Sequence, residues 1–145
     1  MLTFICYPKC STCQKAKVLL DSYSAQYDTR DIKADSPSYD ELKRWLSLSD
    51  LPVRKFFNTS GILYKSLKLK DKLSSMSADE CLNLLAADGM LVKRPLLVDE
   101  YRTLVGFNRI EWESVFTEYD RKKLDGQFQD FFNEMLERVK TTEES

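Results

Sequence analysis

Two closely spaced cysteines are the residues of this chain best suited to chemistry. Cys10 and Cys13 have C-x-x-C spacing, between a short apolar segment and a helical one. At a helix N-terminus, unpaired N–H groups and the helix dipole stabilise a thiolate, and Lys9 and Lys15 add positive charge nearby. We therefore predict that Cys10 is a nucleophile. Cys13, one turn along, is close enough to attack a mixed intermediate on Cys10 and close a disulfide.

Zinc binding is the main alternative for this spacing. A structural zinc site needs four ligands, usually from two paired motifs. The chain has 4 cysteines and 0 histidines, and the other two cysteines are Cys6, in a predicted strand, and Cys81, on the apolar face of a predicted helix. Both fit buried core positions better, so we favour redox chemistry and predict no metal site. The lack of histidine also excludes Ser-His-Asp and Cys-His catalysis.

The composition indicates a folded globular protein. The 145 residues are 43% hydrophobic and 31% charged, with a formal net charge of -1. A chain with so little net charge is unsuited to binding a phosphate backbone directly. No apolar run approaches the ~18–20 residues of a membrane span, and the first residues lack the features of a signal peptide. We expect a cytoplasmic protein with reduced thiols, without membrane or direct nucleic-acid contact.

The elements that must position the cysteines follow from local patterns. Residues 2–6 read as a buried strand, the segment after Cys10 as a helix with a possible Ser11–Gln14 capping box, and residues 26–32 as a second strand. Strand, helix, strand favours a parallel sheet. Residues 35–88 read as a helical insertion, with helix starts at Ser38 and Ser77.

The remainder of the chain completes an α/β pattern. Gly89 is suited to a helix C-cap. Residues 96–98 and 101–105 read as a hairpin, followed by a helix with an apolar stripe from Trp112 to Tyr119. We predict one domain over residues 1–117 and a C-terminal helical extension over 118–145. The apolar stripe of that extension either covers the body of the domain, which we favour, or forms a dimer face.

Three segments together resemble the arsenate reductase (ArsC)/Spx family. They are the residues 7–16, YPKCSTCQKA, the residues 58–61, NTSG, and the residues 93–96, KRPL. The resemblance covers roughly residues 1–117 and is nearest to the uncharacterised ArsC-like branch. It implies a thioredoxin-like (glutaredoxin-like) core with an inserted helical region. It also implies that Cys10 is the catalytic or sensing thiol and that Arg94-Pro95 is a cis peptide beside it.

The resemblance further implies how an oxyanion is held. In the family's arsenate reductases, arginines bind the substrate, and a guanidinium pairs bidentately with oxyanions. Arg54 and Arg94 match two of these positions, whereas Gly106 stands at the third, which puts efficient arsenate reduction in doubt. From sequence alone, Arg54 could equally be a solvated helix residue.

The favoured function is therefore a thiol-disulfide oxidoreductase. Its catalytic residues are Cys10, Cys13 and Arg94, and the predicted substrate-binding residues are Arg54, Ser11, Thr12 and Pro95. The substrate is a small oxyanion or disulfide. No bound cofactor is expected, and a glutathione- or thioredoxin-type thiol system, including a reducing thiol protein, restores the dithiol.

A redox-sensing regulator is the alternative. Members of the Spx branch bind the C-terminal domain of the RNA polymerase α subunit and use the C-x-x-C as a switch. This chain resembles them in that motif, in Lys93-Arg94-Pro95 and in Gly106. Near-zero net charge suits a protein partner better than DNA.

Overall fold

The N-terminal strand organises the sheet that carries the site. In the computed structural model, β1 (Leu2–Cys6) pairs in parallel with β2 (Tyr27–Asp31) and antiparallel with β3 (Leu96–Val98). β3 then pairs antiparallel with β4 (Thr103–Val105). Within the part of the chain that the structure describes, the sheet thus has four strands in the order β2-β1-β3-β4. The fold is α/β and thioredoxin-like, as predicted.

The structure describes residues 1–117 and 134–135. The chain divides into two units, Met1–Arg109 and Ile110–Ser145. Helical backbone begins at residue 109, runs to residue 117 and is found again at 134–135. The predicted extension over residues 118–145 otherwise lies outside the described residues. No helix among the described residues is both long and apolar enough to span a membrane.

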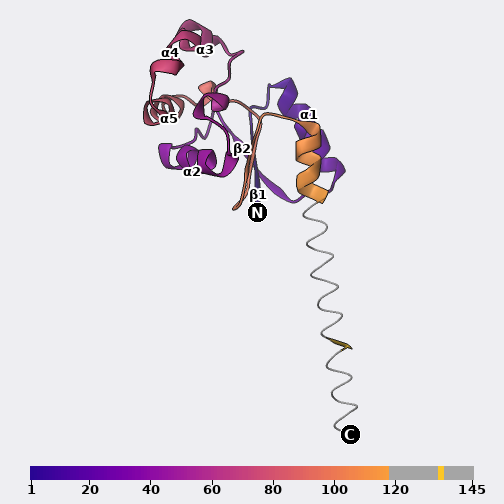
Figure 1. The fold of residues 1–145 in the computed structure, drawn as a ribbon. Coiled ribbons are helices and arrows are strands. Elements are labelled where there is room, and N and C mark those ends of the chain that lie inside the picture. Colours follow the sequence, from indigo (N-terminus) through magenta and orange to yellow (C-terminus); the bar gives the residue numbers. More distant parts are fainter. Residues whose placement is uncertain (118–133, 136–145) are drawn as a thin grey trace. The chain divides into compact units, whose positions relative to one another are not determined.

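Helices flank the sheet of the first unit. α1 (Ser11–Ser22) lies on one side, and α2 (Tyr39–Ser49) and α5 (Ala78–Ala87) lie on the other (Figure 1). Shorter elements complete the predicted helical insertion and lead into β3: η1 (Val53–Phe56), α3 (Ile62–Ser66), α4 (Leu69–Lys72), η2 (Leu73–Ser75) and η3 (Gly89–Leu91).

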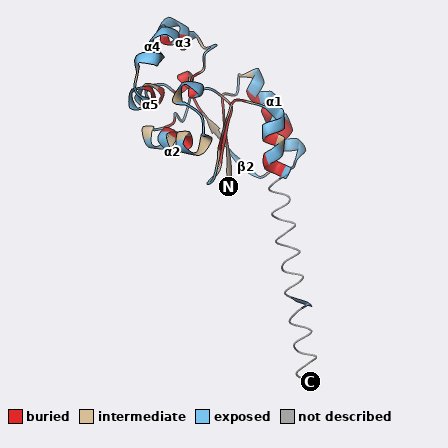
Figure 2. Cartoon of the chain, in the orientation of Figure 1, coloured by how far each residue is buried: buried red, intermediate tan, exposed pale blue. Residues whose placement is uncertain are grey.

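Both faces of β1 and β3 are buried, because helices cover both sides. Ile5 and Leu96 belong to a core cluster with Leu42 of α2 and Leu85 of α5. Their neighbours Phe4 and Leu97 are also buried, and alternation along a strand turns them to the opposite face. Figure 2 shows this burial along the strands and on one side of α1. Such burial fixes the end of β1, and with it the start of α1.

Most local predictions are confirmed. β1 has the predicted bounds, β2 is one residue shorter at each end than predicted, and residues 96–98 and 103–105 form the hairpin. The Ser38 side chain accepts the N–H of Glu41 in a complete capping box, and Ser77 accepts the N–H of Glu80. These signals depend only on near neighbours in the sequence, which explains their reliability.

Two local predictions are wrong. The Ser11–Gln14 capping box does not form: Cys10 is the N-cap of α1, Ser11 is the first helical residue, and the Gln14 amide donates to Pro8 O instead. Gly89 is not the C-cap of α5, a position taken by Asp88. Glycine is needed at 89 because a β-carbon there would lie 2.3 Å from Ile32 O.

An ion pair joins β2 to α2. Arg30 Nη2 donates to Glu41 Oε1 at 2.9 Å, and the guanidinium lies 5.8 Å from the centre of the Trp45 ring. The pKa of Glu41 is lowered to about 2, mainly by its hydrogen bonds from Arg30. Since an unfolded glutamate has a pKa of about 4.3, this pair stabilises the fold above that pH. The contribution is lost as the pH falls toward 2.

We expect Glu41→Gln to lower the free energy of unfolding near pH 5 by on the order of 1 kcal/mol, a value that allows for solvent screening of this part-exposed pair. Glutamine can still accept the capping bond from Ser38, but it loses the negative charge and one of the two hydrogen bonds from Arg30. Urea unfolding of both proteins at about pH 5 and about pH 2.5 measures the difference. The difference should shrink at the lower pH, and one that does not change with pH would contradict this account.

Candidate functional site

The turn between β1 and α1 sets the position of Cys10. Its N–H donates to Tyr7 O at 2.9 Å, and its carbonyl accepts the N–H of Gln14 at 3.1 Å. The backbone of Cys10 is extended, with φ -84 and ψ 124, as befits an N-cap residue. The thiol therefore lies at the end of α1 where the helix presents its unpaired N–H groups.

The surroundings of Cys10 favour its ionised form. Partial burial opposes ionisation. The N–H and thiol of Cys13, the N–H of Thr12 and the charge of Arg94 together outweigh it and lower the pKa of Cys10. A thiolate is the nucleophilic form of cysteine. Cys10 is thus set up to attack an electrophilic sulfur or oxyanion centre.

Cys13 has the opposite character. It is buried on the inner side of α1, and its sulfur accepts the N–H of Tyr7 at 3.4 Å. Burial, and then the neighbouring Cys10, raise the pKa of Cys13 to about 12 despite that hydrogen bond. At neutral pH Cys13 is therefore a thiol that can donate to the Cys10 thiolate, and the two cysteines are chemically distinct.

Arg94 is the cation whose charge lowers the pKa of Cys10. The Arg94-Pro95 peptide is cis, as the resemblance implied. The guanidinium lies 5.2 Å from the centre of the Tyr7 ring, and Nη1 donates to Met90 O at 3.2 Å and to Val92 O at 3.4 Å. These contacts hold the group in place before a substrate arrives, and leave further N–H groups for an anion.

The segment that carries Arg54 lies beside the segment that carries Arg94. Phe57 and Val92 form an antiparallel bridge, and the Lys93 N–H donates to Phe56 O at 2.7 Å. Arg54 itself is exposed, on the short helix η1. Within the described residues its guanidinium has no hydrogen-bonding or ionic partner, so it remains available to a ligand.

The other predicted site residues take different positions. Thr12 is exposed and acts through its backbone N–H, and Ser11 is exposed at the first helical position. Pro95 is buried, and its carbonyl accepts the N–H of Gly106 at 2.8 Å.

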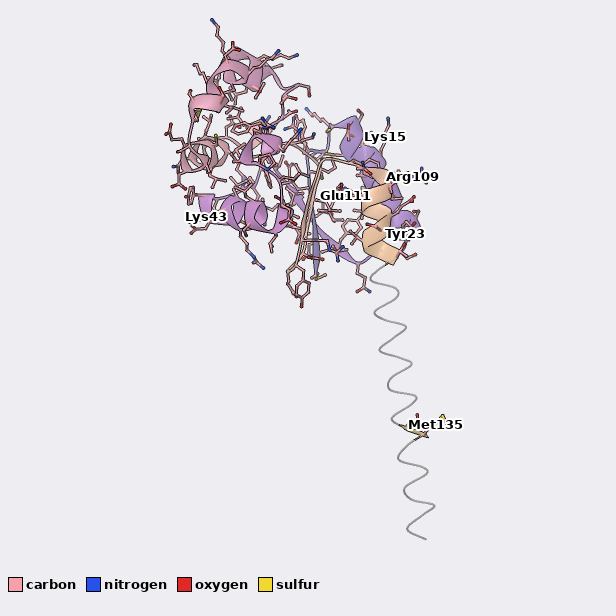
Figure 3. The ribbon with its side chains drawn as sticks, viewed as in Figure 1. Lys15, Tyr23, Lys43, Arg109, Glu111 and Met135 are labelled. Atoms are coloured by element: carbon pink, nitrogen blue, oxygen red, sulfur yellow. The ribbon has the colours of Figure 1, made fainter. Side chains whose placement is uncertain are left out.

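Lys15 points outward from α1 (Figure 3). The charge that lowers the pKa of Cys10 therefore comes from Arg94 and not from this lysine.

Tyr7 is a site residue that the sequence reasoning missed. Its carbonyl and N–H hold Cys10 and Cys13, and its ring lies against Arg94. In the sequence, Tyr7 belongs to the segment 7–16 that carries the family resemblance, but its residue type and spacing gave no sign of a role in the site. Tyr7 is a positioning residue because it acts through the two cysteines and the arginine.

The remaining cysteines are buried, as predicted. Cys6 ends β1, Cys81 lies on α5, and burial raises the pKa of both thiols. All the cysteines belong to the described part of the chain and carry free thiols there. Among the described residues, no three His, Cys, Asp or Glu side chains are grouped as metal ligands.

A family model and several curated proteins match this chain. The model of the ArsC family matches residues 6–115. The uncharacterised protein YusI of Bacillus subtilis is 49% identical over 112 residues, covering 77% of this chain and 95% of YusI. The regulatory protein MgsR of Bacillus subtilis is 33% identical, covering 74% of this chain and 83% of MgsR. The global transcriptional regulator Spx of Listeria innocua is 29% identical, covering 77% and 83%.

Solved structures agree with these matches. An ArsC family related protein of Bacteroides fragilis has a TM-score of 0.77 and 54% identity, covering 78% of this chain and 95% of its own. A possible arsenate reductase of Streptococcus mutans has a TM-score of 0.70 and 53% identity, covering 74% and 92%. The arsenate reductase of Vibrio cholerae has a TM-score of 0.64 and 29% identity, covering 70% and 86%.

Proposed function

Because this chain belongs to the ArsC family, we propose that it is a thiol-disulfide oxidoreductase whose nucleophile is Cys10 and whose resolving cysteine is Cys13. The observation that carries the proposal is the opposite displacement of the two pKa values, lowered for Cys10 and raised for Cys13. A pair of structural cysteines gains nothing from this asymmetry. Thiol exchange is favoured by it, since the sulfur with the lower pKa attacks first while the other stays protonated until the resolving step.

The reaction proceeds in two exchange steps. With a disulfide substrate, the Cys10 thiolate attacks one sulfur, forms a mixed disulfide and expels the other half as a thiolate. Cys13 then attacks the Cys10 sulfur, which breaks the mixed disulfide and closes the Cys10–Cys13 disulfide. The Cys13 proton passes to the departing sulfur, which leaves as a thiol. The substrate gains two electrons and the protein loses them. A dithiol or two glutathione molecules return the protein to its reduced form.

Arg94 contributes to both the attack and the release. Its charge favours the Cys10 thiolate, and its remaining N–H groups are suited to an oxyanion or to the departing thiolate. Thr12 supports the same thiolate through its N–H. Arg54 supplies a second cation from the neighbouring segment. No bound cofactor is needed, since the two thiols carry the electrons themselves.

The proposal is tested by the pH dependence of Cys10 alkylation together with a redox titration. Alkylation of the reduced protein by iodoacetamide, followed by mass spectrometry, should place the Cys10 midpoint below the value of about 8.5 for a free cysteine. Cys13 should stay unmodified at that pH. Equilibration with glutathione mixtures should then give a reversible Cys10–Cys13 disulfide. An ordinary midpoint without a reversible disulfide would sink the proposal.

Two substrate classes need to be separated. The similarity to the arsenate reductase of Vibrio cholerae is an argument for an oxyanion substrate. Glycine at position 106 and the nearby Cys13 are arguments for a disulfide substrate. Turnover of arsenate and of a small disulfide, each coupled to glutathione and to a thioredoxin system, distinguishes them. We expect the disulfide to be the better substrate.

A regulatory function is the second candidate, because MgsR and Spx are among the relatives. Here the same Cys10–Cys13 pair would act as a switch that controls binding to the RNA polymerase α subunit. A pull-down with the C-terminal domain of that subunit, on reduced and oxidised protein, tests it. Lack of binding in both states would exclude this candidate.

A further inference from the structure

Cys6 is a buried thiol that the reaction proposed above does not use. It ends β1. Ile5 belongs to the core cluster on the side of α2 and α5, so alternation along the strand turns the Cys6 side chain to the opposite face, which α1 covers (Figure 1). Cys13 is buried in the first turn of α1. The two thiols therefore share the layer between the sheet and α1.

A hydrogen bond places the Cys13 sulfur against the backbone of Cys6. The sulfur accepts the N–H of Tyr7 at 3.4 Å, and this nitrogen is two covalent bonds from the Cα of Cys6. The Cys13 sulfur is therefore within about 6 Å of that Cα. Electrostatics agrees with this proximity. Burial raises the pKa of both thiols, and the sulfur groups add to it, since Cys6 acts on Cys13 and Cys10 acts on Cys6.

A disulfide between Cys10 and Cys13 has two sulfur atoms that a third thiol can attack. Attack at Cys13 expels Cys10, whereas attack at Cys10 expels Cys13. The pKa of Cys10 is lowered and that of Cys13 is raised to about 12, and the thiol with the lower pKa leaves faster. Both the position of Cys6 and the leaving group therefore favour attack at the Cys13 sulfur.

We propose that Cys6 is a third redox thiol of this site, which takes over the disulfide from Cys10. The Cys6 sulfur attacks the Cys13 sulfur, the Cys10–Cys13 bond breaks, and a Cys6–Cys13 disulfide forms. Cys10 leaves with the electron pair of the broken bond and the proton that Cys6 loses. No oxidant or reductant is consumed, because the disulfide only moves. The inference rests on the proposed function, which supplies the Cys10–Cys13 disulfide.

This transfer changes what the oxidised protein can do. Cys6 is 7% exposed and Cys13 is 2% exposed, so a disulfide between them is out of reach of a protein reductant. Cys10 is half-buried and is returned as a free thiol at the helix start. The oxidised protein thus keeps its nucleophile and can form a mixed disulfide on Cys10 while the internal disulfide persists.

The test traps Cys10 when the transfer releases it. Wild-type protein that carries the Cys10–Cys13 disulfide is freed of oxidant and incubated with iodoacetamide without reductant. The reagent alkylates Cys10 only after the disulfide has moved, and the thioether makes the step irreversible. Trypsin cleaves after Lys9 and Lys15, which puts Cys6 in one peptide and the other two cysteines in the next. The expected product is a disulfide that links the two peptides, with Cys10 alkylated.

Cys6→Ala and Cys6→Ser lack the third thiol and should slow the alkylation of Cys10 in the oxidised protein by about tenfold or more. Cys81→Ala is the matched control, because it removes the other buried thiol outside the C-x-x-C. It should keep both the linked peptides and the wild-type rate. Circular dichroism checks the fold of each variant. The peptides of the wild type decide the question even if a variant does not fold.

An oxidised wild type that keeps its Cys10–Cys13 disulfide and gives no linked peptides would overturn the inference and leave the proposed function standing. Alkylation of Cys10 at the wild-type rate in a folded Cys6→Ala would overturn it as well. Failure of the proposed function is seen earlier, as oxidation that yields no Cys10–Cys13 disulfide, and it would remove this transfer too.

Discussion

Replacing Cys10 by serine should abolish disulfide reduction, with a loss of at least about 10³-fold in turnover. A serine hydroxyl at this position is not ionised at neutral pH and cannot form the mixed disulfide. The substitution is nearly isosteric at a half-exposed N-cap, where serine is itself a preferred residue. The fold should therefore be kept, as circular dichroism can check. Full activity in Cys10→Ser would exclude Cys10 as the nucleophile.

Two replacements of Cys13 separate its roles. Cys13→Ser should react once with a disulfide and then hold the mixed disulfide on Cys10, releasing about one thiol per protein instead of two. Mass spectrometry of the intact protein detects this adduct. Because the Cys13 thiol helps to lower the pKa of Cys10, Cys13→Ala should raise the Cys10 pKa more than Cys13→Ser does. Serine can still donate to the thiolate, whereas alanine cannot.

Arg94→Met should cause the second largest loss of activity. It should raise the midpoint of Cys10 alkylation and lower kcat/KM by about 10²–10³, the range for removal of a positioned donor at developing negative charge. Arg94→Lys should recover part of the effect on the Cys10 pKa, because it restores the charge. It should recover little of kcat/KM, since an ammonium cannot reproduce the planar contacts with Tyr7 and two carbonyls.

The control for Arg94 is Arg44→Met, which removes an exposed arginine from α2, on the side of the sheet opposite to α1 (Figure 1). It should leave both the alkylation midpoint and kcat/KM unchanged. If Arg94→Met instead gave the wild-type alkylation profile and normal turnover, the arginine would serve only to pack against Tyr7. Thermal unfolding of each variant distinguishes a local effect from general loss of the fold.

The sequence by itself determined the parts of this protein that depend on near neighbours. Alternating and helical periodicity located β1, the hairpin and the helices, and Ser38 and Ser77 marked two helix starts. The C-x-x-C at a strand-to-helix junction predicted the lowered pKa of Cys10, since a helix start supplies N–H groups from the next residues in the chain. Each of these signals is contained within about one or two helical turns.

Only the tertiary structure decided the contacts between distant segments. It placed Arg94 on the ring of Tyr7 and the segment of Arg54 beside that of Arg94. It also buried Cys13, which raises the pKa of that thiol. The physical reason is that these relations follow from the pairing of β1 with β3 and of residues 56–58 with 91–93. Pairing between remote segments leaves no periodic trace in the sequence of either one.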